Sequence, residues 1–278
     1  MALCLATPAI LVLLVFVVAL LSLFAASFYT SGQGGGSLTL SNYVKALSDP
    51  LYIGTLAVTV RIAGMTSLVA IMLGLPIAFW IVRTESSALR SGLIMLVTIA
   101  FLTSVIVRLF ALVQVLGNNG LINETLRLLG IIGPNEFLPL MRNEFGVIVG
   151  TLSFATPFVI FMLAGSFRRF DKTLEEAAQG LGADELTTFF RVTVPLLLPG
   201  IVNALLLVFV LSSVTFASPL ILGGGAVNMI SNRIYDQAMI VFNTNFAAAL
   251  AVIALMATLS ILHLAGRLDR RHQSRASA

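Results

Sequence analysis

Charged residues are scarce in this sequence. Only 10% of the 278 residues are Asp, Glu, Lys or Arg, whereas 58% are hydrophobic. A typical soluble domain is about 25% charged and about 45–50% apolar. The composition therefore excludes a water-soluble globular protein and indicates a chain that lies mostly within a membrane.

Residues that usually carry catalysis or bind metals are also few. The sequence has one cysteine, Cys4, and two histidines, His263 and His272, which excludes a disulfide framework and a Cys/His metal site. Neither Gly-rich stretch, at residues 32–36 and 223–225, ends in the Lys-Ser/Thr pair of a phosphate-binding loop. We therefore expect no catalytic residue, no metal and no cofactor in this chain, and an intramembrane enzyme is disfavoured.

Long apolar runs dominate the chain. A bilayer core about 30 Å thick needs about 20 apolar residues per helix, and these runs do not alternate as barrel strands do. The second run can begin as early as Leu51. We interpret the first run as a retained helix rather than a cleaved signal peptide, because no Lys or Arg precedes it. The six predicted spans are residues 9–28, 62–82, 93–116, 145–167, 200–222 and 246–266.

The distribution of Lys and Arg orients these spans. Short cytoplasmic loops of membrane proteins carry an excess of both residues. With six spans, both termini fall on the richer side, which we assign to the cytoplasm. That side holds Arg83, Arg90, Arg168, Arg169, Lys172, Arg191, Arg267, Arg270, Arg271 and Arg275, and the other side holds Lys45, Arg127, Arg142 and Arg233.

Polar residues inside the spans are the candidates for a solute pathway. No Asp or Glu lies in any of the six runs, which disfavours a proton-coupled transporter or cation channel but leaves both open. Hydroxyl groups in spans often bond to helix backbone instead. Arg108, about 22 Å along a straight helix from Leu93, has the alternative role of bracing a carbonyl. The candidates are Ser104, Arg108, Ser153, Thr156 and Ser213.

One polar segment separates the fourth and fifth apolar runs. Thr173 and Glu176 have the spacing of a capping box, which predicts a helix start. Gly182 is placed to end that helix in the left-handed conformation. Asp184 is placed to cap a second short helix.

The first of these short helices has an apolar face. Its apolar residues recur at i, i+3, i+4 and i+7, the spacing of one helix face. Glu175, Glu176 and Gln179 are predicted to face away from it. The residues on the apolar face are Leu174, Ala177, Ala178 and Leu181.

The spacing of this segment resembles the EAA motif of ABC importer permeases. The match consists of Glu176-Ala-Ala, then Gly182, then Val192-x-Val-Pro195. In that family the loop is a coupling helix that docks on the ATP-hydrolysing subunit. The resemblance implies that the coupling residues are Leu174, Glu176, Ala177, Ala178, Leu181, Gly182 and Pro195.

The resemblance extends over about residues 50–265. Ser104-Val-Ile-Val-Arg108, Leu116-Gly-Asn-Asn-Gly-Leu-Ile-Asn123 and Ser218-Pro-Leu-Ile-Leu-Gly-Gly-Gly225 are similar to the spermidine/putrescine branch of these permeases. This implies an all-α integral membrane protein with six transmembrane helices and the type I ABC importer architecture. Residues 1–50 are then the first helix and an external loop, 51–266 the permease domain with its coupling loop at 168–199, and 267–278 a cytoplasmic tail.

The resemblance also implies partners and a location. They are an ABC ATPase dimer that binds ATP and Mg, a second permease subunit that is identical or homologous, and an extracytoplasmic solute-binding protein. The location is the bacterial cytoplasmic (inner) membrane. Two alternatives to a polyamine permease stay open: an ABC permease for another small solute, and a self-sufficient secondary transporter or channel.

Overall fold

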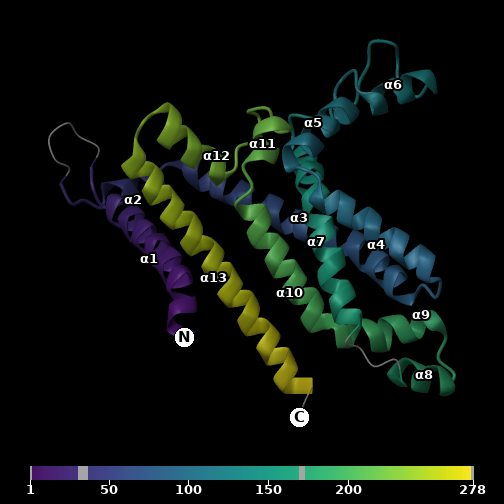
Figure 1. Cartoon of the computed structure of the whole chain (residues 1–278). Coiled ribbons are helices and arrows are strands. Elements are labelled where there is room, and N and C mark those ends of the chain that lie inside the picture. The colour runs from purple at the N-terminus through teal and green to yellow at the C-terminus, as the bar shows by residue number, and fades with distance from the viewer. Residues whose placement is uncertain (1, 31–36, 169–172, 277–278) are drawn as a thin grey trace. The chain divides into compact units, whose positions relative to one another are not determined.

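The computed structural model describes residues 2–30, 37–168 and 173–276, and this part of the chain is almost entirely helical (Figure 1). Arg169 and Lys172, the glycines at 32–36, and the side chains of Arg270, Arg271 and Arg275 lie outside what is described. Among the described residues, five helical segments are long and apolar enough to cross a membrane: Pro50–Arg83, Val105–Leu128, Glu144–Arg168, Glu185–Ser213 and Thr244–Arg267. Ile10–Ala26 and Ser87–Leu102 are shorter apolar helices.

The chain divides into two compact units. The first comprises residues 1–59 and 228–261. Its elements are α1 (Ala2–Ala26), α2 (Ser41–Ser48), the start of α3 (Pro50–Arg83), α12 (Ile230–Tyr235), the π-helical turn η2 (Asp236–Ile240) and most of α13 (Thr244–Ala276).

Phe246 is the centre of the first unit. Its buried ring meets the ring of Tyr52 edge to face, with centroids 5.1 Å apart, an arrangement that aromatic pairs prefer. The ammonium of Lys45 lies 4.8 Å from the centroid of the same ring. The backbone N–H of Ile230 donates to the Thr59 hydroxyl at 2.9 Å. These contacts fasten α2, α12 and the starts of α3 and α13 to one another.

The second unit comprises residues 60–227 and 262–278. It contains the rest of α3, then α4 (Ser87–Leu102), α5 (Val105–Leu116), α6 (Leu121–Leu128), α7 (Glu144–Arg168), α8 (Thr173–Gly180), α9 (Glu185–Thr188), the π-helical turn η1 (Phe189–Thr193), α10 (Val194–Ser213) and α11 (Ala217–Ile221). Its main core lies where α3, α4 and α10 pack around α7. Val159 and Leu163 of α7 are fully buried there.

Glycine lets α3 approach α7 closely. A β-carbon built on Gly74 falls 2.5 Å from Cγ1 of Val159, a separation that real side chains do not adopt. Small residues at helix contacts are typical of membrane bundles, where close backbone approach replaces the hydrophobic driving force. The contact therefore depends on the missing side chain at position 74.

The third predicted span is not a single helix. The expectation of one helix over residues 93–116 is wrong, because α4 ends at Leu102 and α5 begins at Val105. Thr103 and Ser104 between them have extended ψ values of 133° and 134°. The Thr103 hydroxyl donates to the Ile99 carbonyl at 2.7 Å, so a side chain satisfies a backbone carbonyl near the end of α4. The second predicted run does begin early, since α3 starts at Pro50.

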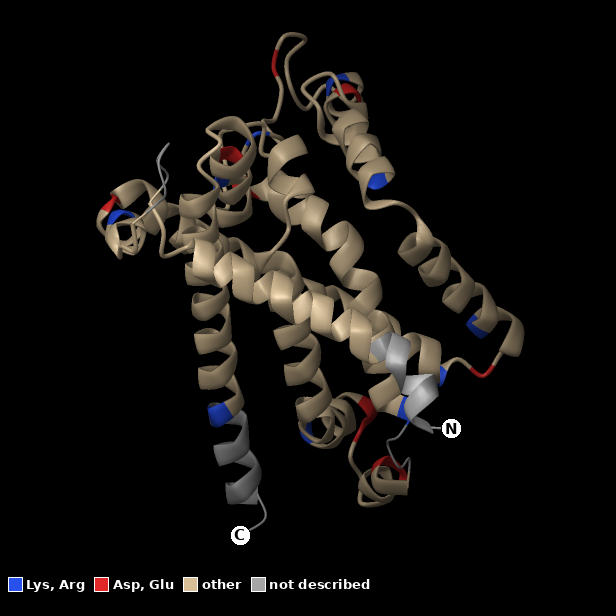
Figure 2. Cartoon of the chain, turned by 60° about the vertical axis from the view of Figure 1, so that its left-hand side comes forward, with Lys and Arg blue, Asp and Glu red and all other residues tan. Residues whose placement is uncertain are grey.

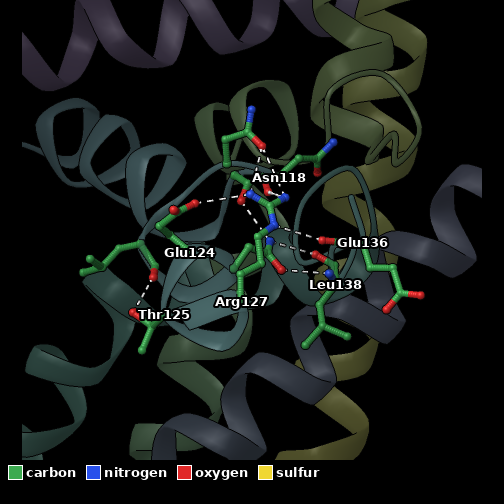
Figure 3. Close-up of polar contacts among 10 residues, drawn as sticks. Asn118, Glu124, Thr125, Arg127, Glu136 and Leu138 are labelled. Carbon is green, nitrogen blue, oxygen red and sulfur yellow. Dashed lines mark hydrogen bonds and ion pairs between the residues drawn. The ribbon is translucent and has the colours of Figure 1, made fainter. Parts of the chain in front are cut away.

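A small module follows α5 and is held by polar contacts (Figure 3). The amide nitrogen of Asn123, which is fully buried, donates to the carbonyls of Gly117 and Leu138 at 3.0 and 3.1 Å. Its amide oxygen accepts from the N–H of Leu138 at 2.8 Å. The Arg127 guanidinium donates to the carbonyls of Asn118 and Glu136, both at 3.1 Å. These bonds fix the loop after α6.

Charged residues are found mostly near helix ends and in the connecting segments (Figure 2). Within the second unit, Arg83 ends α3 and Arg168 ends α7, and Phe79 and Phe167, near these ends, are in contact at 5.6 Å. Arg127 belongs instead to the α6 module, which precedes the start of α7. Arg83 and Arg168, which the orientation count places on one side, thus lie at neighbouring helix ends, and the orientation itself stays a prediction.

Candidate functional site: the loop between α7 and α10 and the polar groups of the helices

The segment between α7 and α10 folds as a helical hairpin. In Figure 1, α9 lies to the right of the adjoining lower ends of α7 and α10, and α8 lies below α9. The helix α8 begins at Thr173, the residue from which a helix start is predicted. After α9, the π-helical turn η1 continues directly into α10, with Pro195 in the first turn, where its missing N–H is tolerated. The hairpin is therefore joined to α10 without a loop.

Gly182 ends α8 as the sequence predicts. Its φ of +92° lies in the region that favours glycine. The N–H of Gly182 donates to the carbonyl of Gln179 at 2.9 Å, and the N–H of Ala183 donates to that of Ala178 at 3.1 Å. These bonds satisfy carbonyls that the end of the helix leaves open.

Asp184 starts α9, also as predicted. Its carboxylate accepts from the N–H of Thr187 at 3.2 Å. Hydrogen bonds from the Thr187 side chain and then from its backbone lower the pKa of Asp184 below its usual 3.8. The charged form of Asp184 is therefore the form that caps this helix.

The apolar face of α8 points away from the rest of the second unit. Leu181 is 90% exposed and Leu174 is 47% exposed. Ala177 and Glu176 are exposed as well, and Ala178 is half-buried. An apolar face of this kind, exposed in the described part of the chain, is suited to contact another protein.

Glu175 does not point outward, contrary to the expectation from periodicity. Its residue is 8% exposed, and its carboxylate forms an ion pair with Arg83 of α3. The other carboxylate oxygen accepts from the hydroxyl of Thr193 at 2.5 Å. Sequence reasoning missed this cluster, because Arg83 is 92 residues away from Glu175.

The structure brings together two of the five pathway candidates. Nη1 of Arg108 donates to the backbone carbonyl of Ser153 at 2.5 Å, so α5 is braced against α7. Nε of Arg108 is buried and has no partner among the described residues. Because α5 begins at Val105, Arg108 lies in the first turn of that helix, and its predicted depth along one helix from Leu93 does not apply.

The other candidates serve their own helices or stand apart. Ser104 is exposed at the start of α5. The hydroxyl of Ser153 donates to Gly150 and that of Ser213 donates to Phe209, both at 2.7 Å and both within one helix. Thr156 is half-buried on α7. Within the described ranges, no group of three or more His, Cys, Asp or Glu residues is arranged to hold a metal ion.

Comparison with known proteins covers nearly the whole chain. A family model described as "Binding-protein-dependent transport system inner membrane component" matches residues 1–274. The spermidine/putrescine transport system permease protein PotB of Escherichia coli (strain K12) is 33% identical over 214 residues, 77% of this chain and 76% of that protein. PotB of Haemophilus influenzae (strain ATCC 51907 / DSM 11121 / KW20 / Rd) is 30% identical over 253 residues, 90% of this chain and 85% of that protein.

A solved structure shares the fold. A chain of a bacterial ABC transporter involved in the import of the acidic polysaccharide alginate superposes with a TM-score of 0.82. The match covers 97% of this chain and 95% of that one, at 18% sequence identity. At that identity the likeness shows the fold alone.

Proposed function

This chain belongs to the family of binding-protein-dependent transport system inner membrane components, and we propose that its solute is a polyamine such as putrescine or spermidine. The chain is a non-catalytic, multi-pass permease subunit of an ABC importer. The observation that carries the polyamine proposal is the 33% identity with a spermidine/putrescine permease over 77% of the chain.

The proposed importer has parts that this chain does not supply. An ABC ATPase dimer binds ATP and Mg²⁺ and hydrolyses ATP. A second permease subunit, identical or homologous, completes the pathway, and an extracytoplasmic binding protein delivers the solute. The chain lies in the bacterial inner membrane with six spans and with both termini in the cytoplasm.

The exposed face of α8 is the proposed contact with the ATPase. Leu174, Ala177, Ala178 and Leu181 supply an apolar surface, and the alanines let the partner approach the backbone. Glu176 lies at the edge of this surface, while Gly182 and Pro195 set the ends of the hairpin. The exposure of Leu181, at 90%, supports this role because an apolar side chain so exposed is available to a partner.

The test of this contact uses two leucines of similar exposure. Leu181→Asp places a charge on the proposed face, whereas Leu128→Asp places one on α6, where the leucine is 81% exposed. We expect the ATPase subunits to be lost from the purified importer with Leu181→Asp and to be retained with Leu128→Asp. Retention in both variants contradicts the proposed contact.

The proposed solute pathway is lined by neutral oxygen atoms. The hydroxyls of Ser104, Ser153, Thr156 and Ser213 attract a cationic amine as hydrogen-bond acceptors. Arg108 would repel a polyamine, and its bond to the Ser153 carbonyl engages the guanidinium with α7. We assign Arg108 to bracing the pathway wall.

The solute is tested in the complete importer. The purified complex, reconstituted in liposomes with its binding protein and internal ATP, is expected to accumulate labelled putrescine and spermidine but not labelled succinate. Binding-protein-stimulated ATP hydrolysis without polyamine uptake points to another small solute. Uptake by this chain in the absence of the ATPase supports a secondary transporter or channel instead.

The proposed orientation is tested by labelling. In a Cys4→Ser background, cysteine introduced at Glu85, an exposed residue between α3 and α4, is expected to react with a membrane-impermeant maleimide only after the cells are opened. Cysteine introduced at Leu128 is expected to react in intact spheroplasts. The reverse pattern contradicts the assignment of sides.

A further inference from the structure

A buried polar cluster joins the α8–α9 hairpin to the end of α3. Glu175 of α8 uses both of its carboxylate oxygens. One pairs with the Arg83 guanidinium, and the other accepts from the Thr193 hydroxyl at 2.5 Å. The three side chains come from α3, α8 and η1, and Arg83 of α3 is 92 residues away from Glu175 in the sequence. We call Arg83, Glu175 and Thr193 the latch.

Aromatic rings support the arginine of the latch. The Arg83 guanidinium carbon lies 5.4 Å from the ring centroid of Phe79, one turn earlier on α3. That ring contacts Phe189 of η1 edge to face at 4.9 Å and Phe167 of α7 at 5.6 Å. A cation placed over an aromatic face is attracted to it. Arg83 is therefore held in position independently of Glu175.

Little else fills the space beside the latch. A cavity of about 520 Å³ is lined by the latch residues, Phe79, Phe189 and the start of α9. The ion pair and the contact between Phe79 and Phe189 connect α3 to the hairpin, and the hydroxyl bond connects α8 to η1. Thr193 is almost fully buried and the Glu175 side chain is 10% exposed, whereas the Arg83 side chain is 25% exposed, so the bond between Glu175 and Thr193 is better shielded from water than the ion pair.

Apolar side chains of the same size could fill the place of this cluster. A buried ion pair contributes little net stability compared with apolar side chains of the same size, but loss of one partner leaves a charge buried without compensation. A cluster of this kind makes the position of α8 relative to α3 depend on one specific contact. Displacement of the hairpin either carries α3 with it or breaks the pair.

We propose that the latch transmits movement of the α8–α9 hairpin to α3, with Arg83, Glu175 and Thr193 as positioning residues for coupling. This inference rests on the proposed docking of α8 on the ATPase. The hairpin already continues into α10 through η1. The latch adds a second connection, so a force applied at α8 acts on two spans of the second unit together.

The latch is tested in the complete importer, reconstituted with its ATPase subunits and binding protein. Arg83→Gln, Glu175→Gln and Thr193→Val each remove one contact. The charge-reversed double variant Arg83→Glu with Glu175→Arg restores the pair. Glu185→Gln is the matched control, because Glu185 is an exposed carboxylate that lines the same cavity outside the latch.

Two measurements separate coupling from assembly. The first is the amount of ATPase retained by the purified complex, and the second is the stimulation of ATP hydrolysis by the binding protein. We expect Arg83→Gln and Glu175→Gln to retain the ATPase and to lose about fivefold or more of the stimulation, the lower end of typical coupling between sites. Thr193→Val is expected to lose less, the double variant to recover most of the stimulation, and Glu185→Gln to behave as the native protein.

Three results overturn the proposal. Native stimulation in the single variants shows that the latch transmits nothing, and the proposed docking face then stands unaffected. Loss of the ATPase from the single variants shows that the cluster merely shapes the docking surface. Failure of the charge-reversed variant to recover stimulation shows that the ion pair is not the operative contact. Failure of the docking proposal itself is detected separately by Leu181→Asp.

Discussion

Replacement of Gly182 by alanine isolates the energetic role of the turn that ends α8. The φ of this residue is +92°, and a β-carbon placed there meets nothing within 4 Å. The substitution therefore introduces backbone strain without a steric clash. An L-residue in the left-handed region costs about 1–2 kcal/mol, and the end of α8 is expected to lose that much local stability.

Gly180 provides a control with the opposite sign. It is the last residue of α8, and a β-carbon there also meets nothing within 4 Å. Alanine at a helical position is favoured over glycine by roughly 0.5–1 kcal/mol. The same chemical change two residues apart is thus expected to destabilise the helix end at Gly182 and to stabilise it at Gly180. Gly182→Asn is expected to cost less than Gly182→Ala, because asparagine tolerates this region.

Hydrogen exchange of the hairpin amides measures the effect. The reporters are the N–H groups of Gly182 and Ala183, which bond to the carbonyls of Gln179 and Ala178. A loss of about 1–2 kcal/mol raises the open population by roughly 5- to 30-fold, so exchange is expected to accelerate by that factor in Gly182→Ala. Exchange in Gly180→Ala is expected to slow by roughly two- to fivefold. Changes of the same sign in both variants would refute the assignment of a left-handed cap.

Three further predictions concern other parts of the chain. Asn123→Ala removes the partners of two carbonyls and one N–H in the α6 module, and each group left unsatisfied costs about 1–3 kcal/mol. The module is therefore expected to become sensitive to limited proteolysis in Asn123→Ala. The control Thr125→Ala, at an exposed position, is expected to stay resistant. Gly74→Ala forces a methyl against Val159 and is expected to lower the thermal unfolding temperature, since overpacking costs about 1–3 kcal/mol. Gly64→Ala on the same helix meets nothing within 4 Å and is the control. The pKa of Asp184 is lowered in the folded chain, so its stabilisation of α9 is complete above the usual pKa of 3.8 and is lost as the pH falls through the lower folded value. Hydrogen exchange of the Thr187 amide is therefore expected to depend on acid pH. This dependence is expected to vanish in Asp184→Asn, because asparagine caps the helix without titrating.

Features that depend on neighbouring residues were predictable from the sequence. Gly182 and Asp184 mark the end of one helix and the start of the next because capping is decided within a few residues. The early start of α3 followed from an apolar run that extends back to Leu51. The family resemblance rested on spacing of the same local kind.

Features that depend on distant residues were not predictable in this way. Periodicity predicts that Glu175 faces away from the apolar face of α8, but it does not predict the ion pair with Arg83. Hydropathy treated residues 93–116 as continuous, because Thr103 and Ser104 lower the average only slightly while their backbone leaves the helix. The sequence leaves open that Arg108 bonds to a backbone carbonyl, but only the fold identifies that carbonyl as the one of Ser153.

The glycine contact between α3 and α7 also fixes the register of the two helices. Ala70 and Ala78 lie four residues before and after Gly74, and both are fully buried in the same core. A slide of α3 along α7 by about 6 Å, four residues at 1.5 Å each, brings one of these alanine methyls to the place where Val159 leaves room only for a hydrogen. Axial sliding between α3 and α7 is therefore blocked in both directions. We therefore expect the part of α3 within the second unit and α7 to keep this register.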